Sequence, residues 1–255
     1  MIPPVLYRQP VPLDSNLHRT KRLVDQPDFS SAAAMHLAYV SVAELPIAAL
    51  DFIVVFIEAA APPPGGKSPL LPVALLGAQV DENLYLQDGQ WTSRYIPAFF
   101  RRHPFANGPR RGRDDQPVVL VDTASPRLSE TEGQRLFDDD GKPSEALNGW
   151  LGFLNMFDRE YQQTIEFCAT LQQRDLLKPM SAQMTLPDGQ ELSLGGFLVF
   201  DTDKYRALSQ RVKAELADNG MLTVLHTHLA SLGNIRYLAE RKARRLGKSS
   251  ATTPT

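Results

Sequence analysis

The chain has 255 residues, of which 43% are hydrophobic and 22% charged, a composition typical of a globular protein with a substantial core. Lysine plus arginine number 27 and aspartate plus glutamate 29, and this net charge of -2 argues against a nucleic-acid partner. The single cysteine, Cys168, excludes an intrachain disulfide framework, and no apolar run reaches the roughly 20 residues of a membrane-spanning helix. The N-terminus lacks the regions of a secretory signal. We therefore expect a soluble, cytoplasmic protein, with export by a route that needs no such signal left open.

The first part of the chain is rich in proline, which fixes φ and removes a backbone donor. We expect residues 1–30 to form an extended arm, anchored by four apolar side chains: Leu6, Tyr7, Val11 and Leu13. Ser41 and Glu44 match the capping-box pattern and predict a short helix to about Leu50. Two apolar runs of strand length follow, and they predict buried antiparallel strands at Phe52–Ile57 and Leu71–Leu76.

The middle of the chain contains a strong turn signal. Asp88-Gly89 stands between alternating apolar residues and predicts a hairpin, because both residues tolerate positive φ. The following residues 93–102 carry an apolar stripe and are expected to be helical up to Pro104. The Gly- and Arg-rich stretch 106–116 is expected to be an exposed loop, and Val118–Val121 another buried strand.

Apolar residues recur every three or four positions from Ser144 to about Leu177, and they predict one long helix with Ser144 as its N-cap. A hairpin at Asp188-Gly189 and a strand at Phe197–Phe200 should follow. The last predicted elements are a helix at 201–216, a helix at 222–246 and a disordered tail at 247–255.

Strands and hairpins occur in clusters between helices, without regular βαβ alternation. This order predicts an α+β fold with a mostly antiparallel sheet, one long helix and a C-terminal helix packed on it. We expect residues 31–246 to form a single domain behind the arm.

Arg101, Arg102 and His103 stand at the end of the expected aromatic helix and are the leading site candidate. Guanidinium groups bind carboxylates and phosphates through paired hydrogen bonds, so one interpretation is an anion clamp. The simpler interpretation is that these cations meet the negative end of the helix dipole. A pocket here would have an aromatic wall, and the full predicted ligand-binding set is Trp91, Tyr95, Phe99, Arg101, Arg102 and His103.

No metal or cofactor site is predicted. His226 and His228 form an H-x-H pair, but residues two apart on a helix do not face each other, so a surface or core role is the simpler interpretation. Asp138–Asp140 are adjacent acids, whereas a calcium loop alternates its acids, so a solvated turn is favoured.

Three further patterns also have simple structural interpretations. Gly65-Gly66-Lys67-Ser68 lacks the upstream glycine of a phosphate loop and is expected to be a surface loop. Cys168 lies in the apolar stripe of the long helix and is expected to be a buried, inert thiol. The last helix is basic, which suits an acidic partner or a membrane surface, or more simply a helix terminus with a solvated tail. Its cations are Arg236, Arg241, Lys242, Arg244, Arg245 and Lys248.

Five stretches carry a resemblance to a known family. They are YRQPVPLDSNLHRTKRL, PVALLGAQVDENLYLQDGQWTSRYIPAFFRRHPF, GQRLFDDDGKPSEAL, LPDGQELSLGGFLVFDTDKYRAL and HTHLASLGNIRYLAERK. On these residues the chain resembles the SapC family of bacterial proteins over nearly its whole length. The family takes its name from a locus for a surface layer, and the resemblance brings no catalytic residues with it.

The resemblance implies a non-catalytic accessory or interaction protein, linked to surface-layer or cell-envelope systems and acting on an unknown protein partner. The alternative is a small-molecule-binding protein or an enzyme, encoded in a nutrient-uptake or halogenase-associated gene cluster. The first hypothesis predicts a shallow surface without convergent polar side chains. The second predicts a pocket with an inward-facing arginine.

Overall fold

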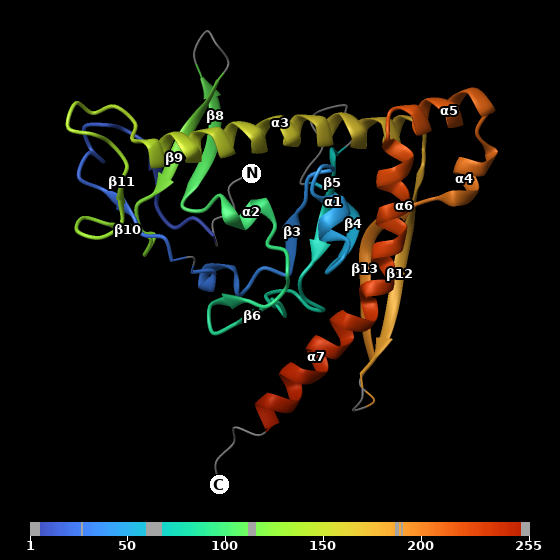
Figure 1. Ribbon diagram of the computed structural model, residues 1–255. Helices are drawn as coiled ribbons and strands as arrows, with labels where there is room; N and C mark the ends of the chain where they lie inside the picture. Colours follow the sequence, from blue (N-terminus) through green and yellow to red (C-terminus); the bar gives the residue numbers. More distant parts are fainter. Residues whose placement is uncertain are drawn as a thin grey trace. The chain divides into compact units, whose positions relative to one another are not determined.

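The computed structural model describes residues 6–26, 28–59, 68–111, 116–186, 189 and 191–250 (Figure 1). Within these residues the fold is α+β, with antiparallel sheets, one long helix and a C-terminal helix, as predicted. The chain divides into two compact units. The first unit holds the residues up to 33 together with 88–91 and 98–159, and the second holds 34–87, 92–97 and the residues from 160 onward.

The first unit contains two small antiparallel sheets of three strands each. One has the order β1-β9-β8, with β1 at Pro10–Pro12, β8 at Phe105–Arg111 and β9 at Gln116–Asp122. The other has the order β10-β2-β11, with β2 at Arg22–Leu23, β10 at Leu128–Ser129 and β11 at Gln134–Arg135. The segment expected to be an arm thus supplies two strands. The prolines of β1 are tolerated because β1 is an edge strand, where a missing N–H costs no ladder bond.

The region 106–116, expected to be an exposed loop, belongs largely to the paired strands β8 and β9. For residues 106–111 and 116 that prediction was wrong, because a composition rich in glycine, proline and arginine was taken to exclude a strand; residues 112–115 lie outside the described residues. The pairing register shifts between Asn107 and Arg110, and such a bulge accommodates Gly108 and Pro109 within a strand. The strand predicted at Val118–Val121 is confirmed as part of β9.

The long helix is confirmed as α3, at Glu145–Gln173. Ser144 caps it, since its Oγ accepts a hydrogen bond from the Leu147 N–H at 3.1 Å. The part of α3 that belongs to the first unit buries Leu147 and Leu154 in a core with Phe105. The rest of α3 belongs to the second unit, where Cys168 is among its core residues.

The helix expected at 93–102 is much shorter, with α2 at Ala98–Arg101. Pro97, next to this helix, explains the difference, because the residue before a proline avoids helical φ and ψ. Helix α2 ends before Pro104, as predicted. A single 3-10 turn, η1, lies earlier in the same unit at Ser30–Ala32.

The second unit contains a five-stranded antiparallel sheet of order β12-β13-β4-β5-β3. Its strands are β3 at Leu37–Tyr39, β4 at Ile53–Glu58, β5 at Leu70–Leu75, β12 at Leu177–Thr185 and β13 at Glu191–Phe200. The predicted antiparallel pair β4 and β5 is confirmed, with a register from Ile53↔Leu75 to Glu58↔Leu70. In contrast, β13 meets β4 only at Leu198↔Phe56.

Both predicted hairpins are confirmed. β6 at Leu86–Gln87 pairs with β7 at Gln90–Trp91, and Asp88 and Gly89 between them have φ of 51° and 73°. The second hairpin joins β12 and β13, and its Gly189 has a φ of 82°. Glycine and aspartate supply these left-handed positions at low cost.

The capping box before α1, at Leu45–Ala48, is confirmed on both sides. The Ser41 N–H donates to Oε2 of Glu44 at 3.1 Å, and the Glu44 N–H donates to Oγ of Ser41 at 3.2 Å. This reciprocal pair satisfies two backbone donors that a helix start otherwise leaves unpaired.

The two C-terminal helices of the prediction are each divided in the structure. The helix expected at 201–216 is α4 at Thr202–Ala207 and α5 at Gln210–Asp218, because Leu208 and Ser209 are extended. The helix expected at 222–246 is α6 at Met221–Ser231, a 3-10 turn η2 at Leu232–Asn234, and α7 at Ile235–Ser250. Helix α7 also extends past residue 246, where the tail was expected to begin.

Polar side chains stand at every third position through the end of α6 and η2: His228, Ser231 and Asn234. His228 accepts a hydrogen bond from the Phe200 N–H at Nε2 (3.2 Å), and its Nδ1 lies 2.8 Å from the Val54 carbonyl oxygen. Ser231 Oγ accepts from the Val54 N–H at 3.0 Å, and Asn234 Nδ2 donates to the Phe52 carbonyl at 2.9 Å. These side chains complete the hydrogen bonding of β4 where β13 no longer pairs with it. Figure 1 shows α6 beside the β12–β13 hairpin.

Two searches of the described residues, one for membrane-spanning helices and one for metal-binding clusters, found none. No helix among them is long and apolar enough to span a membrane. No group of three or more histidine, cysteine or acidic residues among them is placed to hold a metal ion. His228 is a buried core histidine, and His226 is exposed.

Candidate functional site

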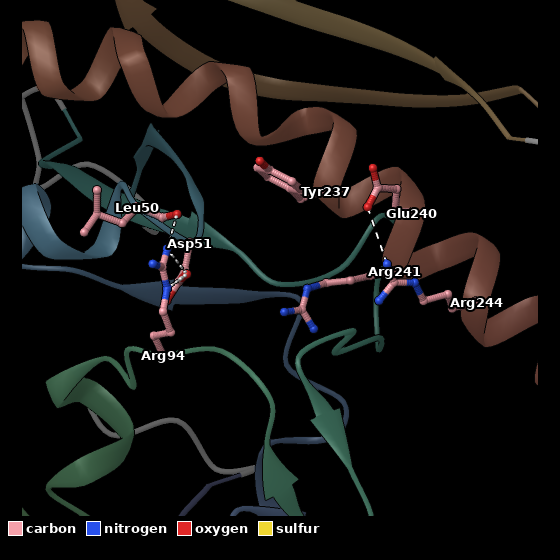
Figure 2. A pocket seen from close by; sticks show the side chains of 7 residues that line it. All are labelled: Leu50, Asp51, Arg94, Tyr237, Glu240, Arg241 and Arg244. Carbon is pink, nitrogen blue, oxygen red and sulfur yellow. Dashed lines mark hydrogen bonds and ion pairs between the residues drawn. The ribbon is translucent and has the colours of Figure 1, made fainter.

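A pocket of about 380 Å³ opens in the second unit, between α7 and the turn that follows α1 (Figure 2). Its lining is mostly charged: Leu50, Asp51, Arg94, Tyr237, Glu240, Arg241 and Arg244. Guanidinium, carboxylate and phenol groups therefore line one cavity. Such groups can bind a ligand through its charge and through hydrogen bonds.

One wall of the pocket is a fixed ion pair. Asp51 Oδ1 accepts a hydrogen bond from Nε of Arg94 at 3.1 Å, and Oδ2 accepts from the Tyr95 N–H at 3.0 Å. Nη2 of Arg94 also donates to the Leu50 carbonyl at 3.3 Å. The Asp51 carboxylate thus balances the charge of Arg94, although the Arg94 side chain is 78% exposed.

The other wall is one face of α7. Tyr237, Glu240, Arg241 and Arg244 are spaced by three, four and seven residues, which places them on the same side of a helix. Arg244 forms an ion pair with Glu240, with a nitrogen–oxygen distance of 3.6 Å. The charge of Arg244 is therefore also balanced inside the pocket lining.

Arg241 differs from the other two arginines. Its Nη1 donates to Oγ1 of Thr92 at 2.8 Å and its Nη2 to the Thr92 carbonyl at 3.4 Å. Its guanidinium carbon lies 4.2 Å from the ring centroid of Tyr85, a cation–π contact. All of these partners are neutral, and no described carboxylate forms an ion pair with Arg241. Arg241 therefore brings an oriented but unbalanced positive charge to the pocket.

The contacts of α7 correct the expectation of a solvated basic terminus. Lys242 is buried and pairs with Glu82, and its Nζ also donates to Oε1 of Gln79 at 3.1 Å. Nη1 of Arg245 donates to the carbonyls of Asn83 and Leu86 at 3.3 and 3.2 Å. The expectation was wrong for these cations because the segment before the first hairpin offers acceptors that the sequence pattern does not reveal. These contacts hold α7 as a wall of the pocket.

Three of the residues predicted from sequence to bind a ligand are buried in the first unit: Phe99, Arg102 and His103. Arg102 is 2% exposed, with its guanidinium carbon 5.0 Å from the Phe99 ring centroid and 4.6 Å from that of Phe157. His103 is buried, and its Nε2 lies 3.3 Å from Oδ2 of Asp122. Burial lowers the pKa of His103 despite the opposing effect of Asp122. The side chains of Arg102 and His103 thus contact other side chains of the first unit.

Asp122 ties the N-terminal segment to this cluster. Its carboxylate accepts hydrogen bonds from the N–H groups of Gln9 at 2.8 Å and Arg8 at 3.1 Å. Burial alone would raise the pKa of Asp122, but these hydrogen bonds and the contact with His103 lower it. Tyr7 donates its hydroxyl to the Phe105 carbonyl at 2.8 Å, so the predicted anchor role of Tyr7 is confirmed.

The remaining predicted site residues are dispersed. Arg101 is exposed, with its guanidinium carbon 5.3 Å from the ring centroid of Phe153. Trp91 packs on Phe100 with ring centroids 5.1 Å apart. Tyr95 belongs to the second unit, where its hydroxyl contacts the Glu44 carboxylate. None of the six predicted residues is among those that line the described pocket, and a binding role for them stays a prediction.

Sequence reasoning missed most of the pocket. Arg241 and Arg244 were noted only as part of a basic terminus, and Leu50, Asp51 and Arg94 were not singled out. One signal was available, namely the helical spacing of Tyr237, Glu240, Arg241 and Arg244. The contribution of residues 50, 51 and 94 depends on tertiary folding and has no local pattern.

Of two other sequence interpretations, local contacts settle one, the acidic turn. Asp138–Asp140 form a turn in which Oδ1 of Asp138 accepts from the N–H groups of Asp140 and Lys142 at 3.0 and 2.8 Å. The Asp138 carboxylate thus accepts hydrogen bonds from the backbone of its own turn. The glycines and lysine of Gly65-Gly66-Lys67-Ser68 lie outside the described residues.

Cys168 is expected to resist thiol reagents as long as the protein is folded. Its side chain is buried, and burial raises the pKa of its thiol to about 12, so the reactive thiolate is scarce at neutral pH. Mass spectrometry after iodoacetamide treatment should find Cys168 unmodified in native buffer and modified in urea. Modification in native buffer at the rate of a free cysteine would contradict this expectation.

Comparison with known proteins adds one finding. The model of the SapC family matches residues 13–238. Neither a curated protein nor a solved structure matched the chain. The matched segment includes Asp51, Arg94 and Tyr237, whereas Glu240, Arg241 and Arg244 follow its end. The contribution of Glu240, Arg241 and Arg244 to the pocket is therefore observed in this chain alone, because the family match ends before these residues.

Proposed function

We propose that this protein, which belongs to the SapC family, is a non-catalytic binding protein that recognises a small anion in the pocket between α7 and the Asp51–Arg94 pair. The observation that supports this proposal most strongly is the unbalanced charge of Arg241. Guanidinium groups present five N–H donors, and the hydrogen bonds of Arg241 to Thr92 leave several of them for a carboxylate or phosphate.

The orientation of Arg241 favours binding because little conformational freedom is left to lose. A flexible arginine loses side-chain entropy when it captures a ligand, and that loss weakens affinity. Here the contacts with Thr92 and with the buried ring of Tyr85 already hold the guanidinium group. A volume of about 380 Å³ falls within the range of small-molecule sites, roughly 300 to 1,000 Å³.

Replacement of Arg241 by methionine is expected to weaken anion binding by about tenfold to a hundredfold, the equivalent of one charged hydrogen bond of about 1.5 to 3 kcal/mol. Methionine keeps an unbranched side chain of comparable girth but removes the guanidinium group, and with it the hydrogen bonds to Thr92 and the cation–π contact with Tyr85. Isothermal titration calorimetry with acetate, phenylacetate, succinate and phosphate measures the change.

The matched control is Arg206→Met, because Arg206 is also an arginine of the second unit, paired at the surface with Asp203 and outside the pocket. It should leave binding unchanged. The proposal is wrong if no anion binds the wild type, or if both variants lose affinity equally. Arg101→Ala in the same titration tests the separate prediction of a site at Arg101 and Arg102.

The cellular setting is also part of the proposal. The family name supports a role as an accessory protein in surface-layer or cell-envelope systems, and the pocket suits the alternative of small-molecule binding in a nutrient-uptake or halogenase-associated cluster. A pocket that binds a small anion without chemistry is compatible with either setting. The cytoplasmic location stays an expectation from the sequence.

A further inference from the structure

We infer that the anion is a monocarboxylate that carries an apolar group, such as an aryl or alkyl acid. This inference deepens the proposed function and rests on it. Two independent features of the lining support it, the balance of charge and the position of two exposed apolar side chains.

The charge balance favours a single negative charge on the ligand. Three arginines and two carboxylates line the pocket, which leaves a formal excess of one positive charge. Arg94 is paired with Asp51 and Arg244 with Glu240, so the excess lies on Arg241. A monoanion balances it. A dicarboxylate or a phosphate brings a second negative charge toward Asp51 and Glu240, where like charges repel.

The apolar side chains favour a ligand with an apolar body. Leu50 is 61% exposed and Tyr237 is 42% exposed, and both are among the residues that line the pocket. The Tyr237 ring is held in place, since Nη2 of Arg236 donates to its hydroxyl at 2.8 Å. A ligand that covers these two side chains removes apolar surface from water, which favours binding.

The size of the pocket agrees with both features. A bare carboxylate needs little of a volume of about 380 Å³. The remaining space can hold a ring or a short chain while the carboxylate contacts Arg241. Affinity should then grow with the apolar group, by roughly fourfold for each methylene group that becomes buried.

The inference is tested by calorimetric titration of the full chain with acetate, hexanoate, phenylacetate, succinate and phosphate at neutral pH. We expect phenylacetate and hexanoate to bind at least about tenfold more tightly than acetate. Succinate and phosphate should bind no more tightly than acetate. If succinate or phosphate binds most tightly, or if acetate equals phenylacetate, the inference is wrong and the proposed function stands. If none of these anions binds, both are wrong.

Two variants test the apolar contacts directly. Leu50→Ser and Tyr237→Ser should each lower the affinity ratio of phenylacetate to acetate severalfold. Ile47→Ser is the matched control, because Ile47 is 48% exposed on the neighbouring helix α1 and does not line the pocket. It should keep the wild-type ratio. Equal ratios in all three variants would overturn the inference, and melting temperatures establish that each variant is folded.

Discussion

Acidification from pH 7 to pH 4 is expected to lower the free energy of unfolding by about 3 kcal/mol through His228 alone. Burial lowers the pKa of His228 from 6.5 to about 4, against the raising effect of its hydrogen bond to Val54. Between these two values the unfolded chain binds a proton that the folded chain does not. The full stability is therefore present above pH 6.5, and it is lost progressively as the pH falls toward 4.

The physical reason is that the neutral ring of His228 forms hydrogen bonds with one backbone N–H group and one backbone carbonyl group. One ring nitrogen accepts from the Phe200 N–H, and the other donates to the Val54 carbonyl. A charged imidazolium carries a proton on both nitrogens and cannot accept, so protonation breaks the bond to Phe200 and places a charge in the core.

Urea unfolding of the wild type at a series of pH values between 7 and 4 measures this loss. His228→Gln should be less stable at neutral pH but lose the part of the pH dependence that lies below 6.5. His226→Gln is the matched control, because His226 is exposed on the same helix and should leave the wild-type curve unchanged. If His228→Gln and the wild type show the same slope with pH, the assignment to His228 is wrong.

Local features of this fold could be predicted from the sequence because their causes lie within a few residues. The capping box of Ser41 and Glu44 and the turn at Asp88-Gly89 depend on short-range hydrogen bonds and on permitted φ values. The apolar periodicity of α3 is a property of one continuous segment. The prediction for 93–102 was wrong because Pro97 prevents the helix from starting earlier. The prediction for 106–116 was wrong because a β-bulge admits Gly108 and Pro109 into a strand.

The candidate site could not be predicted in the same way because its parts are far apart in the chain. Asp51, Arg94 and Arg241 meet only after the sheet, the turn after α1 and α7 have been assembled. The role of His228 also depends on the point where β13 diverges from β4, which no pattern around residue 228 indicates. By contrast, Arg102 looked like a ligand-binding residue because sequence shows its charge but not its burial.

Replacement of Lys242 by methionine is expected to lower the free energy of unfolding by about 3 to 5 kcal/mol. The side chains of Lys242 and Glu82 are only 8% and 15% exposed, so removal of the ammonium group leaves a carboxylate in a poorly hydrated place. Methionine has a similar length, and a cavity therefore contributes little to the loss. Chemical unfolding at neutral pH measures it.

A double-mutant cycle separates the pair from its surroundings. Lys242→Met combined with Glu82→Gln removes both charges, and the glutamine carbonyl can still accept from the Ala78 N–H, which now donates to Glu82 at 3.0 Å. The double variant should recover most of the lost stability, because the cost of an unpaired buried charge disappears. Arg206→Met is the control, since its pair with Asp203 is exposed and should contribute less than about 1 kcal/mol.

The same pair also links stability to the pocket. Lys242 follows Arg241 on α7, so the contact with Glu82 sets where α7 presents Arg241 to the cavity. Lys242→Met should therefore weaken anion binding, and the double variant should restore part of it. If Lys242→Met lowers the free energy of unfolding no more than the Arg206→Met control does, the contact with Glu82 is not what holds α7. Its other contacts would then hold it, among them the buried side chain of Leu238 and the hydrogen bonds of Arg245 to Asn83 and Leu86.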